Sequence, residues 1–120
     1  MGKFSKDKGK RGERELVNFL KAQGIPAERT AQHSGKDGGP ADLILPDHPD
    51  WHIECKRVEA LSLYGALGQA ATDAQNSNKK AQIPAVFHRR NNQPWVMIVF
   101  ADLGAKLIQY HDLCAREFEL

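Results

Sequence analysis

The 120-residue chain has few cysteines and no long hydrophobic run, and each shortage excludes a class of protein. Two cysteines, Cys55 and Cys114, do not make a disulfide framework like that of small secreted domains, which indicates a reducing compartment. No apolar stretch approaches the roughly 20 residues that a transmembrane helix needs. The basic N-terminus lacks the apolar segment that follows it in a secretory signal. We therefore expect an intracellular, cytoplasmic protein (in the host cytoplasm if the source is a virus) with no membrane partner.

The composition is that of a small globular domain whose positive charge is unevenly placed. Hydrophobic residues make up 41% and charged residues 27% of the chain, and its length predicts one domain. The net charge is only +2, but basic residues cluster in two places. They are Lys3, Lys6, Lys8, Lys10, Arg11 and Arg14, and then Lys79, Lys80, Arg89 and Arg90. Such clusters are solvated faces or sites for a polyanion, and a metal-type site beside them favours the polyanion.

Hydrophobic periodicity and turn residues predict an alternation of strands and helices within one domain, residues 11–120. The continuous apolar run Trp95–Phe100 predicts a well-buried strand. The expected elements are a flexible basic arm at 1–10, a helix from Arg11 to before Gly24, a strand at 27–32, a glycine-rich loop at 33–39, a hairpin with strands at 40–45 and 51–57, a helix at 60–78, strands at 83–90 and 94–100, a short helix at 101–107, and an ambiguous C-terminal segment that is helical around 112–117.

The hairpin carries the strongest chemical pattern, which consists of Asp42, Glu54 and Lys56. Successive side chains of a strand point to opposite faces, so Glu54 and Lys56 share one face and Cys55 points to the other. If the two strands pair, Asp42 comes close to both. Two carboxylates and an amine in a small volume suit a hard divalent cation with a lysine beside it. The plainer alternative is a surface ion pair between Glu54 and Lys56 on an edge strand.

Glu13 is an acid on the apolar stripe of the first expected helix. It lies three, four and seven residues before Leu16, Val17 and Leu20, so it shares their face. One interpretation places it in the first turn, where the helix dipole favours an acid. The other is a carboxylate directed at the hairpin site. Spacing alone does not distinguish them.

Taken in order along the chain, these motifs resemble a known nuclease family. Pro40-Ala41-Asp42 followed by Glu54-Cys55-Lys56 is similar to the pattern of the PD-(D/E)XK nuclease superfamily. Together with Lys10–Leu16, Arg29 and Ile83–Val86, it resembles the archaeal-type Holliday junction resolvases over about residues 8–100. Two features depart from the pattern of this family. The glycine-rich loop is longer than expected, and the hairpin turn contains His48, Pro49 and Asp50. Both departures bear on junction preference more than on chemistry.

The resemblance implies an α/β fold with a restriction-endonuclease-like core, in which helices flank a central mixed sheet. It implies a Holliday junction resolvase that hydrolyses phosphodiester bonds to leave a 5′-phosphate and a 3′-hydroxyl. Asp42, Glu54 and the carbonyl of Cys55 would hold Mg²⁺, for which Mn²⁺ would substitute. Lys56 would be the catalytic lysine, and Glu13 would complete the metal site.

The resemblance also implies how branched DNA would be held. We expect no base-reading motif and a homodimer whose interface includes the strand from Trp95 and the following C-terminal segment. The expected DNA-binding residues are Lys10, Arg11, Arg14, Arg29, Ser34, Lys36, Gln69 and Arg89.

Other functions remain open at this point. The chain could be a flap nuclease or nickase of the same superfamily, a non-catalytic DNA-binding module, or an RNA-processing enzyme. A zinc site is not supported, because the five histidines and two cysteines form no ligand motif. Cys55 is not expected to be a nucleophile, since its side chain faces away from Glu54. Core or interface packing is favoured over base stacking for Trp51 and Trp95.

Overall fold

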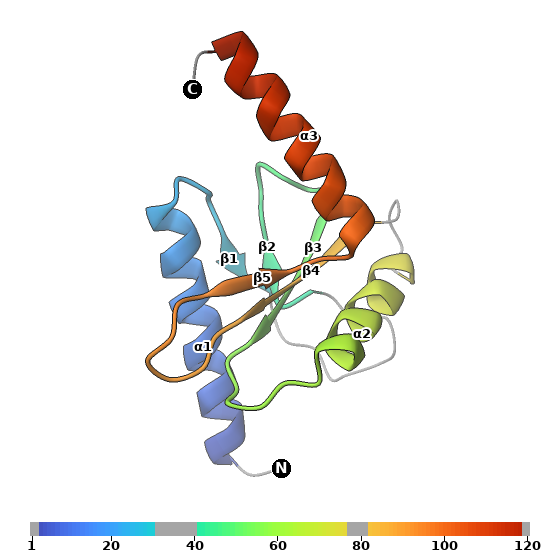
Figure 1. Cartoon of the computed structure of the whole chain (residues 1–120). Coiled ribbons are helices and arrows are strands. Elements are labelled where there is room, and N and C mark those ends of the chain that lie inside the picture. Colours follow the sequence, from blue (N-terminus) through green and yellow to red (C-terminus); the bar gives the residue numbers. More distant parts are fainter. Residues whose placement is uncertain (1–2, 31–40, 77–81, 119–120) are drawn as a thin grey trace.

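The computed structural model describes residues 3–30, 41–76 and 82–118, which form an α/β fold around one mixed sheet (Figure 1). Three helices and five strands lie within these residues. In chain order they are α1 (Lys3–Ala22), β1 (Glu28–Arg29), β2 (Leu43–Ile44), β3 (Trp51–Lys56), α2 (Leu63–Gln75), β4 (Ile83–His88), β5 (Val96–Ile98) and α3 (Ala101–Phe118).

The strands lie in the sheet in the same order as in the chain, from β1 to β5. Strands β1, β2 and β3 form an antiparallel meander, and the predicted hairpin between β2 and β3 is confirmed by the pairing of Leu43 with Ile53. Strand β4 runs parallel to β3, so α2 serves as the crossover between them. Strand β5 returns antiparallel to β4 and forms the second edge of the sheet.

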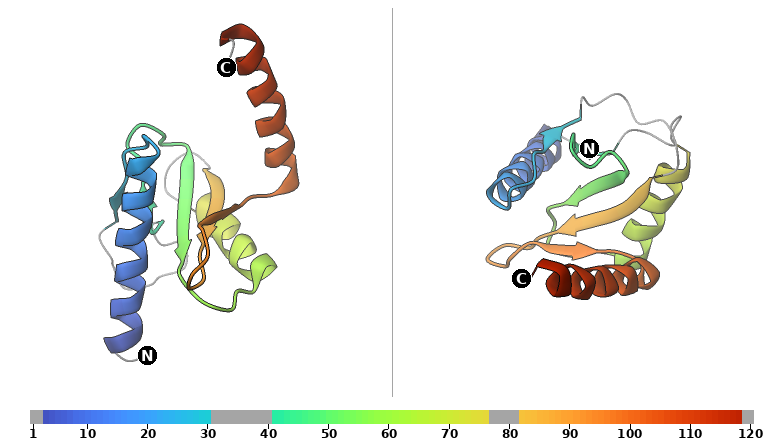
Figure 2. Two further views of the ribbon diagram at one scale, coloured as in Figure 1. Left: turned by 60° about the vertical axis from the view of Figure 1, so that its left-hand side comes forward. Right: turned by 90° about the horizontal axis from the view of Figure 1, so that it is seen from above.

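Helices α1 and α2 cover opposite faces of the sheet (Figure 2). Leu16 and Leu20 of α1 pack on Leu43 and Ile53 in the larger core. A smaller core lies under α2, where Leu67, Ala70 and Val86 meet. Because strand side chains alternate, the two faces of β3 serve different layers. Ile53 and Cys55 face α1, whereas the face bearing His52, Glu54 and Lys56 is directed toward α2.

Helix α1 begins at Lys3, so the expectation of a flexible arm over residues 1–10 is wrong for residues 3–10. Lysine is a good helix former, and the first turns need no apolar periodicity of their own to extend a helix that is anchored farther along the chain. The predicted end before Gly24 is confirmed. Gly24 adopts a φ of +85°, and the amide of Ile25 donates to the carbonyl of Leu20 at 2.9 Å, which closes the helix.

The C-terminal part of the chain also differs from expectation. Strand β5 is short and its Val96 and Met97 are exposed, so the prediction of a well-buried strand is wrong. The short helix predicted at 101–107 continues as α3 to Phe118 and includes the segment left ambiguous. Helix α3 extends from the end of β5 away from the sheet (Figures 1 and 2). Among the described residues, no helix is long and apolar enough to cross a bilayer.

Candidate active site

The register of β2 on β3 places Asp42 against the end of β3. The amide of Asp42 donates to the carbonyl of Ile53 at 3.0 Å, and the amide of Cys55 donates to Oδ2 of Asp42 at 2.8 Å. A side-chain hydrogen bond joins Asp42 to Glu54. The structure therefore brings together the two carboxylates that the sequence pattern pairs.

These two carboxyl groups have opposite pKa shifts. Burial, then the charge of Glu54 and the hydrogen bond to it, raise the pKa of Asp42 to about 8, although the Cys55 amide opposes the rise. Burial would also raise the pKa of Glu54, but hydrogen bonds from His52 and Asp42 and the charges of His52 and Lys56 hold it below its ordinary value. At neutral pH the pair thus keeps one proton, located mainly on Asp42.

This donor set fits a divalent cation. Asp42 and Glu54 offer oxygen ligands in a half-buried position, which is the chemistry that Mg²⁺ and Mn²⁺ prefer. Ionisation of both of two adjacent carboxyl groups is energetically unfavourable unless a positive charge lies between them. A cation would take the place of the proton now held on Asp42.

Glu13 and Lys56 flank this carboxylate pair from two elements. Glu13 is only 9% exposed, and its charge contributes to the raised pKa of Asp42. Because α1 begins at Lys3, Glu13 is not in its first turn, so the helix-dipole interpretation is wrong. Arg29 Nε donates to Glu13 Oε1 at 3.0 Å. Lys56 is exposed, and its charge helps to lower the pKa of Glu54.

Sequence reasoning missed His52 and Asp73 at this site. His52 is buried, and its Nε2 lies 2.8 Å from Glu54 Oε1. Asp73 of α2 comes close enough that one ligand atom of each of His52, Glu54 and Asp73 lies within 4.8 Å of the others. Gln69 donates to Asp73 Oδ1 at 3.1 Å and is thereby linked to the same group. His52 could have been found, since it precedes Glu54 by two residues on one strand face.

Cys55 has the side-chain orientation expected from strand alternation. Its thiol packs against the core under α1, and burial raises its pKa well above the ordinary value. A protonated, buried thiol is a poor nucleophile. Only its backbone is available to the carboxylate side.

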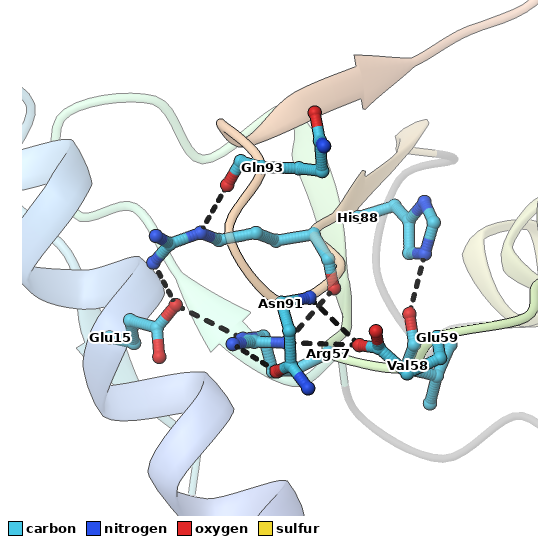
Figure 3. A network of polar contacts seen from close by, with 8 residues as sticks. Glu15, Arg57, Val58, Glu59, His88, Asn91 and Gln93 are labelled. Carbon is cyan, nitrogen blue, oxygen red and sulfur yellow. Dashed lines mark hydrogen bonds and ion pairs between the residues drawn. The ribbon is translucent and has the colours of Figure 1, made fainter.

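A second polar network joins α1 to the ends of β3 and β4 (Figure 3). Glu15 Oε1 accepts from Arg57 Nε at 3.1 Å and from Arg89. Arg57 Nη2 donates to Asn91 Oδ1 at 3.0 Å, and Arg89 Nε donates to the carbonyl of Gln93 at 2.6 Å. The predicted DNA-binding residue Arg89 is therefore held by internal partners, although 31% of its side chain is exposed.

The other predicted DNA-binding residues lie on several elements. Lys10, Arg11 and Arg14 are exposed on α1, which leaves their charges accessible to a phosphate backbone. Arg29 is half-buried beside Glu13. Ser34 and Lys36 lie outside the described residues.

With this geometry in place, comparisons with known proteins give the family. Residues 4–112 match the sequence profile of the archaeal Holliday junction resolvase (Hjc) family. The chain belongs to this family. It is a Holliday junction resolving nuclease, an endodeoxyribonuclease that acts on branched DNA in recombination and repair. Nucleases of this kind need a divalent metal ion. The acidic groups described above could bind such an ion.

Comparison with solved structures supports the same fold. Hjc from the archaeal hyperthermophile Archaeoglobus fulgidus superposes with a TM-score of 0.58 and 21% sequence identity, over 76% of this chain and 76% of that chain. The predicted restriction-endonuclease-like α/β core is thereby confirmed. A search among curated protein sequences gives no match.

Proposed function

We propose that this Hjc-family nuclease cuts four-way junctions at a Mg²⁺ centre held by Asp42, Glu54 and the carbonyl of Cys55, with Glu13 completing the site. The observation that carries the proposal is the half-buried Asp42–Glu54 pair, which keeps one proton beside Lys56. Oxygen ligands alone favour Mg²⁺, and Mn²⁺ would substitute for it. The free cysteines and the DNA substrate agree with an intracellular, cytoplasmic location.

Each protein group has a distinct task in this mechanism. A bound divalent cation supplies polarisation of the scissile phosphate and a lowered pKa for a water ligand. Lys56 is exposed next to Glu54, where its ammonium can orient the attacking water or stabilise the charge that develops on the phosphate. Arg29 neutralises part of the charge of Glu13, which limits repulsion between that acid and Asp42.

Binding of the junction would rest on phosphate contacts and on DNA shape. Lys10, Arg11 and Arg14 present charge along α1, and Arg29 is paired with Glu13 beside the site. Ser34, Lys36, Gln69 and Arg89 complete the proposed set. Contacts of this kind position a duplex without reading bases, so affinity should fall steeply with salt.

We further propose that the enzyme is a two-fold homodimer, because a four-way junction has two strands to cut symmetrically. Large apolar side chains are exposed on the edge strand β5 and on α3, the helix that extends away from the sheet (Figure 2). They are Val96, Met97, Phe100, Leu107, Ile108, Tyr110 and Leu113. Exposed large apolar side chains on neighbouring elements are typical of a protein–protein interface.

Cleavage of a labelled four-way junction tests the metal centre. Asp42→Asn and Glu54→Gln should each reduce Mg²⁺-dependent cleavage by at least about 10³-fold, because each removes an anionic ligand that the cation needs. Junction binding, measured by fluorescence anisotropy without Mg²⁺, should remain within a few-fold of wild type, since neither change removes a basic residue.

Matched substitutions provide the controls. Asp47→Asn in the turn of the same hairpin and Glu28→Gln on β1 change exposed acids and should retain cleavage. Mapping products on all four strands should give paired, symmetric nicks on the junction, with flap, splayed and linear duplexes cut less. Undiminished cleavage by Asp42→Asn or Glu54→Gln would overturn the site assignment.

A further inference from the structure

We propose that His52, Glu54 and Asp73 form a second metal site, which takes a transition-metal ion such as Mn²⁺ and shares Glu54 with the first centre. The inference rests on the proposed function for the identity of that first centre. The second site lies between β3 and α2, and it adds a nitrogen ligand that Asp42, Glu54 and the Cys55 carbonyl do not offer.

The distances suit one ion. His52 Nε2 and Glu54 Oε1 are 2.8 Å apart, and the Asp73 carboxylate oxygen lies within 4.8 Å of both. Ligands about 2.1 Å from a metal in cis positions lie about 3 Å apart, and trans ligands lie about 4 Å apart. All three ligand atoms can therefore reach one ion with small side-chain movements. The ion would take the place of the hydrogen now shared by His52 and Glu54.

The surroundings hold these ligands in place. The His52 side chain is 2% exposed on a strand that is paired on both sides, and that of Glu54 is 14% exposed. Gln69 donates to Asp73 Oδ1, which restricts the carboxylate from the helix side. A hydrogen bond from outside the ligand set is a usual means of orienting a metal ligand.

The ligand chemistry distinguishes the two centres. An imidazole favours first-row transition ions, whereas Mg²⁺ prefers oxygen ligands and retains its water. Excess Mg²⁺ should therefore compete at the first centre and not at the second. Glu54 would bridge the two ions, as a carboxylate does in two-metal nuclease sites, where the ions lie about 4 Å apart.

A simpler role for His52 is to orient Glu54 through their hydrogen bond, with no metal at all. That role needs His52 and Glu54 only. A metal site also needs Asp73, which comes from a different element, α2, and lies close to both. Substitution of Asp73 therefore separates the two roles.

Mn²⁺ binding to the purified full chain without DNA provides the test, by electron paramagnetic resonance of the free ion. Wild type should bind two Mn²⁺ per chain. In Asp73→Asn, the site from which excess Mg²⁺ does not displace Mn²⁺ should bind Mn²⁺ at least about 10-fold more weakly. Asp42→Asn should lose the ion that Mg²⁺ displaces, and Asp47→Asn should retain both.

Spin-echo modulation supplies a second measurement. The Mg²⁺-resistant Mn²⁺ should show coupling to a ¹⁴N nucleus, and His52→Gln should abolish that coupling. A single Mn²⁺ per wild-type chain, or two in Asp73→Asn, would overturn the second site. Either result leaves Asp42-dependent junction cleavage intact as evidence for the proposed function, whereas two Mn²⁺ sites without junction cleavage would contradict that function alone.

Discussion

The Asp42 carboxyl is buried beside Glu54, and its pKa of about 8 makes the metal-free protein sensitive to pH. In the unfolded chain the same carboxyl titrates near 3.8. Between about pH 4 and pH 8 the folded state therefore holds a proton that the unfolded state has released. The free energy of unfolding of the metal-free protein should fall as pH rises through this window.

Replacing Asp42 by Asn should remove this loss. In urea denaturation with a chelator at pH 8, Asp42→Asn should be more stable than wild type by on the order of 2 kcal/mol, and near pH 4 the difference should vanish. The amide oxygen of Asn can still accept the hydrogen bond from Cys55. Added Mg²⁺ should stabilise wild type and not the variant, because only wild type has both acidic ligands.

Asp47→Asn is the matched control for this measurement, since Asp47 is exposed in the turn of the same hairpin. It should show no pH-dependent difference from wild type. If Asp42→Asn proves less stable than wild type in chelator at pH 8, the proposed burial of a proton on Asp42 is wrong.

At the level of residues, strand alternation and pairing in the hairpin were enough to predict that Asp42 and Glu54 lie close together. The same alternation places His52 on the face of Glu54, so His52 could have been found from the sequence although it belongs to no ligand motif. Asp73 could not be predicted in this way, because its approach depends on the rotation of α2 over the sheet. Local spacing predicts contacts within one hairpin and does not predict contacts between layers.

Among the elements, α1 approaches the residue directly after β3 so closely that one position of α1 requires a glycine. A Cβ added at Gly12 would lie 2.5 Å from the Cβ of Arg57, an atom that side-chain rotation cannot move away. Gly12→Ala should therefore lower the free energy of unfolding by about 1–3 kcal/mol in urea denaturation. It should also disturb the Arg57–Glu15 ion pair.

Gly9→Ala on the same helix is the control, since nothing lies within 4 Å of a Cβ there. It should leave stability unchanged or raise it by up to about 1 kcal/mol, because alanine is the better helix former. Equal effects of the two substitutions would contradict the close approach to Arg57 as the reason for a glycine at position 12.

Element types were predictable, whereas the limits and burial of elements were less so. Lysines at the start of α1 lack apolar periodicity, so sequence reasoning favoured an arm where the structure has helix. The apolar run Trp95–Phe100 indicated burial, but β5 is an exposed edge of the sheet. An apolar pattern predicts that a surface is buried. It does not predict whether the same chain or a partner protein buries that surface.

For the whole molecule, the exposed apolar surface of β5 and α3 leads to a prediction about assembly. Ile108 of α3 is 67% exposed. Many exposed apolar side chains on one part of a protein mark an interaction surface. Ile108→Glu would place a charge in the proposed two-fold interface, twice per dimer. Analytical ultracentrifugation should therefore give a dimer for wild type and a monomer for the variant, whereas Gln109→Glu should remain dimeric.

The consequence for cleavage follows from where the site residues lie. Asp42, Glu54 and Lys56 all come from one chain, so a monomer would keep all the residues of the proposed metal centre. Ile108→Glu should therefore still nick one junction strand in Mg²⁺ but should lose the paired, simultaneous cuts. With a supercoiled plasmid that extrudes a cruciform, the variant should give nicked circles, whereas wild type should give linear product. A monomeric wild type, or an Ile108→Glu variant that remains dimeric and still linearises the plasmid, would contradict the proposed interface.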